Sequence, residues 1–149
     1  MIDKKFIGYD IGSHNVDVEK GRLKLFNKVI GQTNPIYCDE AKAIEAGYPG
    51  LPVPPTFYFS IDFEQPDPFD WFEEVGIDLV RLLHGEQEFK YHAQAFAGDS
   101  LHISAKVGDI YSKKNGALDF VIKEVTIIRE DGQLIATLKS TLIIRNEVA

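Results

Sequence analysis

Apolar and polar residues alternate through the second half of the chain, and this period-two pattern limits the fold more than any other feature. Residues 101–107 read Leu-His-Ile-Ser-Ala-Lys-Val, which predicts a strand with one buried face. Pairs of turn-forming residues separate this stretch from further strand-like runs: the turn pairs stand at 98–99, 115–116 and 131–132, and the runs at 86–92, 118–128 and 134–144. The pattern predicts an antiparallel meander.

Helical patterns precede the strands. Apolar residues recur at helical spacing over residues 20–30 and are followed by Gly31, a typical helix terminator. A second, short helix is predicted between Asp39, a favourable N-cap, and Gly47. The first helix is expected to bury one face, and the second to lie at the periphery.

The middle of the chain is rich in proline and aromatic residues. Prolines between residues 48 and 55 interrupt regular structure, because they remove backbone donors and fix φ. Residues 56–63 are apolar on nearly every side, which favours a buried central helix, with a strand as the alternative. Residues 64–78 mix acids, prolines and aromatics, a composition typical of a surface excursion that can act as a lid. Helices followed by strands predict an α+β fold with a helix on one face of the sheet.

Composition excludes several classes of function. A chain of 149 residues suits a single domain, residues 1–149, and its net charge of −7 opposes binding to nucleic acid. The lone cysteine, Cys38, cannot form an internal disulfide and has no paired base for nucleophilic chemistry. Apolar runs fall short of the ~20 residues that span a bilayer, and metal-ligand spacings are missing. We expect a cytoplasmic protein with no membrane contact, metal or cofactor.

Three segments resemble a known family. Residues 26–37 read Phe-Asn-Lys-Val-Ile-Gly-Gln-Thr-Asn-Pro-Ile-Tyr, residues 47–57 read Gly-Tyr-Pro-Gly-Leu-Pro-Val-Pro-Pro-Thr-Phe, and residues 84–88 read His-Gly-Glu-Gln-Glu. They resemble the MaoC-like (R)-specific enoyl-CoA hydratases and 3-hydroxyacyl dehydratases, most closely their N-terminal, non-catalytic half or subunit. The resemblance implies a hot-dog fold, in which an antiparallel sheet wraps around a central helix.

The family's catalytic pair is replaced in this sequence. By resemblance, an Asp follows the glycine and a His follows the Asn-Pro-aliphatic triplet, and these positions hold Gln32 and Tyr37. Adding water across a conjugated thioester needs a base and an acid near neutral pH. A glutamine amide is not basic there, and an unperturbed tyrosine has a pKa near ~10. The degenerate pair predicts a retired or modified active site, with a simple turn after the helix as the alternative.

The resemblance also implies residues that bind substrate. These are Asn34 in the degenerate motif and the start of the central helix, namely Pro54, Pro55, Thr56, Phe57 and Tyr58. Aromatic residues here and at 69–72 suit the lining of an acyl channel, although each taken singly also suits an ordinary core. His84, followed by Glu86, is the candidate substitute for the missing acid and base, with a histidine hydrogen-bonded at a strand start as the alternative.

The leading functional hypothesis is a subunit of a (3R)-hydroxyacyl-thioester dehydratase, or trans-2-enoyl-CoA hydratase, that shapes the acyl-binding channel. Its expected partners are an acyl-CoA or acyl-carrier-protein thioester and a second hot-dog chain, either a copy of itself or a catalytic subunit. Two alternatives remain. One is a self-sufficient homodimeric hydratase or thioesterase that uses other residues such as Tyr37, His84 or Glu86. The other is a non-enzymatic acyl-CoA-binding module.

Overall fold

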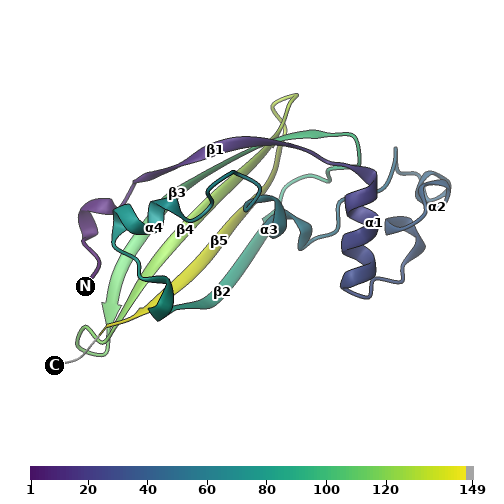
Figure 1. Cartoon of the computed structure of the whole chain (residues 1–149). Coiled ribbons are helices and arrows are strands. Elements are labelled where there is room, and N and C mark those ends of the chain that lie inside the picture. Colours follow the sequence, from purple (N-terminus) through teal and green to yellow (C-terminus); the bar gives the residue numbers. More distant parts are fainter. Residues whose placement is uncertain (147–149) are drawn as a thin grey trace.

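A five-stranded antiparallel sheet forms the body of the protein (Figure 1). In this computed structural model, residues 1–146 are described. The strands are β1 (Asp10–Asp17), β2 (Leu82–Tyr91), β3 (Ser100–Lys113), β4 (Leu118–Arg129) and β5 (Leu134–Arg145), in the spatial order β1-β3-β4-β5-β2. The helices are α1 (Lys20–Val29), α2 (Glu40–Glu45), α3 (Phe57–Ile61) and α4 (Asp70–Val75), with short 3₁₀ turns at Lys4–Phe6, Pro35–Tyr37 and Leu79–Arg81.

The alternating pattern is confirmed for the centre of the sheet and was incomplete at its edges. Strands β3, β4 and β5 form the predicted meander, but β2 pairs with β5 at the opposite side of the sheet and not with β3. The sequence analysis also did not predict β1, which pairs with β3. The sheet is therefore broader than a simple meander, and its two edges are β1 and β2.

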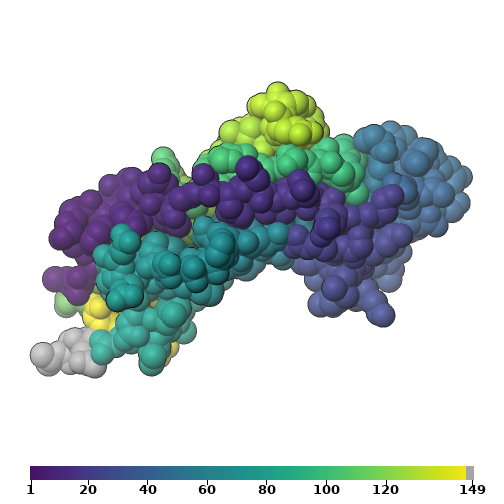
Figure 2. All heavy atoms as spheres, turned by 45° about the horizontal axis from the view of Figure 1, so that its top comes forward, coloured from purple at the N-terminus to yellow at the C-terminus, as the bar shows by residue number. Residues whose placement is uncertain are grey.

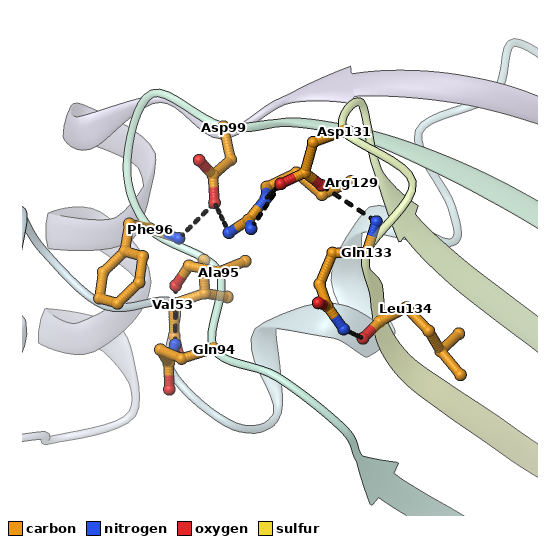
Figure 3. A network of polar contacts seen from close by, with 9 residues as sticks. All are labelled: Val53, Gln94, Ala95, Phe96, Asp99, Arg129, Asp131, Gln133 and Leu134. Atoms are coloured by element: carbon orange, nitrogen blue, oxygen red, sulfur yellow. Dashed lines mark hydrogen bonds and ion pairs between the residues drawn. The ribbon is translucent and has the colours of Figure 1, made fainter.

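The segment between β2 and β3 explains this correction. Instead of closing a hairpin, it runs beside residues 51–53, because Val53 N–H donates to Ala95 O at 2.8 Å. Figure 3 shows the polar network that fixes it: Asp99 accepts from Phe96 N–H at 2.9 Å and lies 3.6 Å from the Arg129 guanidinium, which also binds Asp131 at the β4–β5 turn. The Gly98-Asp99 turn therefore joins a crossing segment to β3.

The two predicted N-terminal helices are confirmed. Helix α1 ends one residue before the predicted end, and Gly31 follows at a φ of +71°, a backbone conformation that favours glycine. The carboxylate of Asp39 caps α2 by accepting from Ala41 N–H at 2.9 Å. Both helices lie beyond one end of the sheet (Figure 1). None of the helices within residues 1–146 is long and apolar enough to cross a membrane.

The central helix is buried as predicted, but it is short. Helix α3 has five residues and spans about 8 Å, whereas the 14 residues of β3 extend over about 45 Å. A second element must therefore cover the rest of the sheet face. That element is α4, which lies next to α3 against the same face (Figure 1).

The prediction that residues 64–78 form a surface excursion holds for residues 64–70, which are exposed or half-buried, and was wrong for residues 71–77. Trp71, Phe72 and Val75 are buried, and they pack with Val107 and Val121 of the sheet in one of two apolar clusters. The other cluster lies around α1 and α3. In Figure 2 the N-terminal residues (purple) lie along the teal region that contains α4. There the Tyr9 hydroxyl donates to Glu74 of α4. Residues 71–77 therefore complete the core and are not a separate lid.

Candidate functional site

The degenerate motif forms a tight turn after α1. The Gln32 Oε1 atom accepts from Asn34 N–H at 3.0 Å, and Asn34 Oδ1 accepts from Ile36 N–H at 3.2 Å. Tyr37 ends the 3₁₀ turn that follows, and both Gln32 and Tyr37 are half-buried. Gln32 and Asn34 therefore stabilise the local backbone, as short polar side chains do in turns. The structure brings the three motif residues into one loop, and their functional role stays a prediction.

Asn27 anchors this loop from α1, a role that the sequence analysis missed. Its side chain is fully buried, and Nδ2 donates to the carbonyl of Tyr37 at 2.8 Å. The helical spacing of the sequence indicates this burial, because Asn27 stands four residues after Leu23, on the face of α1 that enters the core. A buried amide on an apolar helix face needs hydrogen-bond partners: the Tyr37 carbonyl accepts from Nδ2, whereas Oδ1 is buried without a partner among the described residues.

Replacing Asn27 with Ala is expected to lower the free energy of unfolding by about 1–3 kcal/mol, because a backbone carbonyl loses its partner inside the protein. Urea denaturation followed by circular dichroism measures the change. Thr33→Ala, at an exposed position of the same loop, is the matched control and should stay within about 0.5 kcal/mol of the wild type. Equal stability of the two variants would contradict the anchoring role.

The predicted binding segment 54–58 divides between the core and a surface cavity. Pro54 and Phe57 are buried, and Phe57 packs edge-on against Phe26 of α1 with ring centroids 5.2 Å apart. Pro55 and Tyr58 line a cavity of about 370 Å³ together with Tyr91 and His92 at the end of β2. This cavity joins the start of α3 to the edge of the sheet.

Hydrogen bonds at the start of α3 are largely internal. Phe57 N–H donates to Pro54 O at 3.1 Å, Phe59 N–H donates to Thr56 O at 3.2 Å, and the two prolines carry no N–H. Exposed Thr56 precedes the helix without a side-chain capping bond. Burial raises the pKa of Tyr58 to about 12, so its hydroxyl stays protonated near neutral pH. Tyr58 is therefore a hydrogen-bonding group in this wall and not a base.

A second cavity, of about 190 Å³, lies between the helical layer and the inner face of the sheet. Its wall is mostly aromatic and aliphatic, with Phe59, Phe63, Phe69, Trp71, Phe72 and Leu142 among its members. His84 stands at this wall on β2, and its imidazole stacks on the Phe59 ring with centroids 5.4 Å apart. We refer to this space as the inner cavity. Its apolar wall suits an apolar ligand segment.

Glu86 does not accompany His84. The strand pairing shifts between His84 and Glu86, and Glu86 faces the opposite side of the sheet together with Glu88 and Lys139. A β-bulge of this kind changes which way the following side chains point. The predicted pairing of His84 with a neighbouring carboxylate on its own strand was therefore wrong, because Gly85 is the bulged residue.

The wall of the inner cavity also contains a buried ion pair that the sequence analysis missed. Lys123 Nζ on β4 lies 2.7 Å from Asp62 Oδ2 just after α3, and the two side chains are 6% and 3% exposed. Lys123 stands between the buried Val121 and Val125, at an inward position of the period-two pattern. A charged residue at such a position was the available signal. The described residues include no cluster suited to hold a metal ion.

A sheet wrapped around a short helical layer is the hot-dog fold, and solved dehydratases share it. The structure matches a chain of the HadBC 3R-hydroxyacyl-ACP dehydratase complex of Mycobacterium tuberculosis with a TM-score of 0.76 and 22% identity, over 93% of this chain and 96% of that chain. It also matches a MaoC-like dehydratase with a TM-score of 0.79 and 23% identity, over 95% of this chain and 42% of that one. These likenesses establish the fold.

Sequence comparison gives the family. A family model described as "FAS1-like, dehydratase domain region" matches residues 5–138. A UPF0336 protein of Saccharopolyspora erythraea is 32% identical over 145 residues, which is 97% of this chain and 92% of that protein. The chain belongs to the FAS1-like dehydratase domain family. The predicted relationship to hot-dog dehydratases is confirmed.

Proposed function

We propose that this chain is the channel-shaping subunit of a (3R)-hydroxyacyl-thioester dehydratase, which in reverse is a trans-2-enoyl-thioester hydratase. The observation that carries the proposal is the occupancy of the dyad positions. They hold Gln32, whose side-chain oxygen accepts a backbone hydrogen bond, and Tyr37, which ends a 3₁₀ turn. A family member built in this way keeps its fold and lacks the usual base and acid.

The chemistry requires those two groups from elsewhere. Hydration needs a base that takes a proton from water as it attacks C3, and an acid that delivers a proton to C2. Dehydration reverses both transfers. Gln32 and Tyr37 do not supply this pair near neutral pH. The proposal therefore assigns the Asp and His to a second hot-dog subunit, while this chain binds the acyl part of the thioester.

The inner cavity supports the binding role. Its aromatic and aliphatic wall matches the apolar body of an acyl chain, and burial of such a chain is favourable at roughly 25 cal/mol per Å². His84 stands at the wall on an exposed strand position, where an entering chain can pass it. Neither a CoA nor an acyl-carrier-protein group is selected by these contacts, and the proposal covers both thioesters.

The free edge of β2 supports the presence of a second subunit. Strand β2 ends the sheet, and among the described residues it pairs with β5 alone. Leu79, Val80 and Leu83, at and just before this edge, are large apolar residues with 56%, 94% and 43% of their surface exposed. Open sheet edges and contiguous exposed apolar residues are typical of surfaces that pair with another chain.

The test is an assay of trans-2-enoyl-CoA hydration, followed by loss of the conjugated enoyl absorbance and by a check for free CoA. The purified chain alone is expected to show no turnover, because it lacks a positioned base and acid. Co-expression with an Asp- and His-bearing hot-dog chain from the same genome should yield a complex that hydrates the substrate.

Three results would overturn the proposal. Hydration by the chain alone would show that other residues form a complete site, and His84→Ala would then show whether the imidazole takes part. Release of CoA without hydration would identify a thioesterase. A catalytic partner that is fully active alone and gains nothing from this chain would also contradict the assigned role.

A further inference from the structure

A polar row crosses the inner face of the sheet between the two apolar clusters. Lys123 of β4 and Ser140 of β5 stand opposite each other in the strand register, and Ser140 stands opposite Gln87 of β2. The Ser140 hydroxyl donates to Gln87 Oε1, and Asp62 reaches Lys123 from the end of α3. Apolar residues of one cluster lie on one side of this row and those of the other cluster on the opposite side.

Burial of this polar row costs free energy, and the fold does not need polar residues at these positions. Removing a lysine and a carboxylate from water costs more than their attraction usually returns, so apolar residues of similar size often serve stability as well or better. The neighbouring inward positions of β4, Val121 and Val125, show that apolar side chains fit this face. A polar row at the wall of an otherwise apolar cavity therefore points to a ligand group that it contacts.

Some hydrogen-bond donors of the residues around the cavity have no acceptor among the described residues. The Trp71 indole N–H is buried and has no acceptor among the described residues. The Lys123 ammonium has three donors, of which one is directed to Asp62, and its Nζ lies 5.6 Å from the Phe63 ring centroid. Asp62 balances the charge of Lys123, so the wall favours a neutral acceptor over a second carboxylate.

We infer that the inner cavity selects an acyl chain that carries a further neutral oxygen, a keto or hydroxyl group in addition to the C3 hydroxyl of the reaction itself, placed to accept a hydrogen bond from Lys123. This inference rests on the proposed function and specifies its substrate class. A volume of about 190 Å³ holds a segment somewhat larger than benzene, which fills an apolar cavity of about 150 Å³. The oxygen therefore belongs to a segment of about six to eight non-hydrogen atoms that enters the cavity.

The protein contains its own probe for this site. Trp71 is the only tryptophan of the chain and lies in the cavity wall, so its fluorescence reports occupancy directly. The experiment titrates the wild-type protein with medium-chain saturated acyl-CoA thioesters and with matched thioesters that carry one keto group at successive chain positions. At the best-matched position the keto thioester is expected to bind about tenfold more tightly than its saturated counterpart, the effect of one added hydrogen bond.

A double variant locates the effect. Lys123→Met with Asp62→Asn removes the ion pair at nearly constant volume and should abolish the keto preference while saturated thioesters still bind. Lys139→Met on the opposite face of the sheet is the matched control and should keep the preference. Circular dichroism confirms that each variant is folded, and the wild-type comparison stands without the variants.

The outcomes separate the inference from the proposed function. Equal binding of keto and saturated thioesters to the wild type would overturn the inference and leave the acyl-binding role intact. A keto preference that persists in a folded double variant would also overturn it. If no thioester of either kind changes Trp71 fluorescence or binds by calorimetry, the inference and the acyl-binding role fail together.

Discussion

Lys123→Met is expected to lower the free energy of unfolding by about 3–5 kcal/mol, because it leaves the Asp62 carboxylate buried without its partner. Asp62 is 3% exposed and its Oδ2 atom lies 2.7 Å from Lys123 Nζ, so water has little access to the orphaned charge. For a domain of this size the loss corresponds to a fall of roughly 10 °C in Tm. Chemical denaturation and thermal melting of the two purified proteins measure it.

The double variant Lys123→Met with Asp62→Asn should recover most of this loss, since it removes both charges together. The difference between the double variant and the sum of the single variants gives the coupling free energy of the pair. Lys106→Met, at an exposed position where Lys106 pairs with Glu124, is the control and should change stability by less than about 1 kcal/mol. A single variant at Lys123 that is as stable as this control would show that the pair is solvated in solution.

The sequence predicted the elements whose apolar pattern is strong. Strand β3 alternates cleanly, and β4 and β5 alternate over most of their length, because one face of the sheet packs against helices. Strand β1 carries only Ile11 and Val16 as large apolar residues, and most of its positions are partly or fully exposed at the sheet edge. Such a strand is held by its pairing with β3, which a local pattern does not reveal.

Helix α4 was misjudged because acids and prolines dominate its neighbourhood. Within it, Trp71 and Val75 stand four residues apart and share one buried face, a spacing that composition alone conceals. The need for this helix comes from the sheet. Only when α3 proves too short to cover β3 does a second covering element become necessary.

The candidate site was predictable where it is local in sequence and not where it depends on the fold. Gln32, Asn34 and Tyr37 lie within six residues, so a motif places them in one loop. Lys123 and Asp62 are 61 residues apart, and they meet only because α3 ends above β4. A position that combines period-two burial with a charge indicates that a partner exists, but it does not say which residue it is.

The separation of His84 from Glu86 also required the structure. Residues two apart on a regular strand share a face, so the sequence placed the imidazole and the carboxylate together. The bulge at Gly85 breaks that rule, and an added Cβ at this position would lie 2.5 Å from Ile143 Cδ1, so a larger residue would displace the Ile143 side chain. A lone glycine in a strand indicates a bulge, but it does not show to which face of the sheet the neighbouring side chains point.

Installing the family's catalytic pair, with Gln32→Asp and Tyr37→His, is expected to create trans-2-enoyl-CoA hydratase activity at least about a hundredfold above the wild-type chain. This gain is the lower range of what a positioned acid and base contribute. The loop should tolerate both changes. An Asp at position 32 can accept from Asn34 N–H as Gln32 does, and Asn27 holds the Tyr37 backbone carbonyl, which any residue keeps.

The matched control is Gln32→Asn with Tyr37→Phe, which makes changes of similar size without introducing an acid or a base. Initial rates of enoyl absorbance loss are compared at one substrate concentration for the wild type and both double variants. If the Asp and His variant is folded, binds the thioester and is no faster than the Asn and Phe variant, the loop after α1 does not face the substrate. In that case the assignment of Gln32 and Tyr37 to the dyad positions is wrong, and the catalytic geometry of this chain must be sought along β2, where His84 meets the inner cavity.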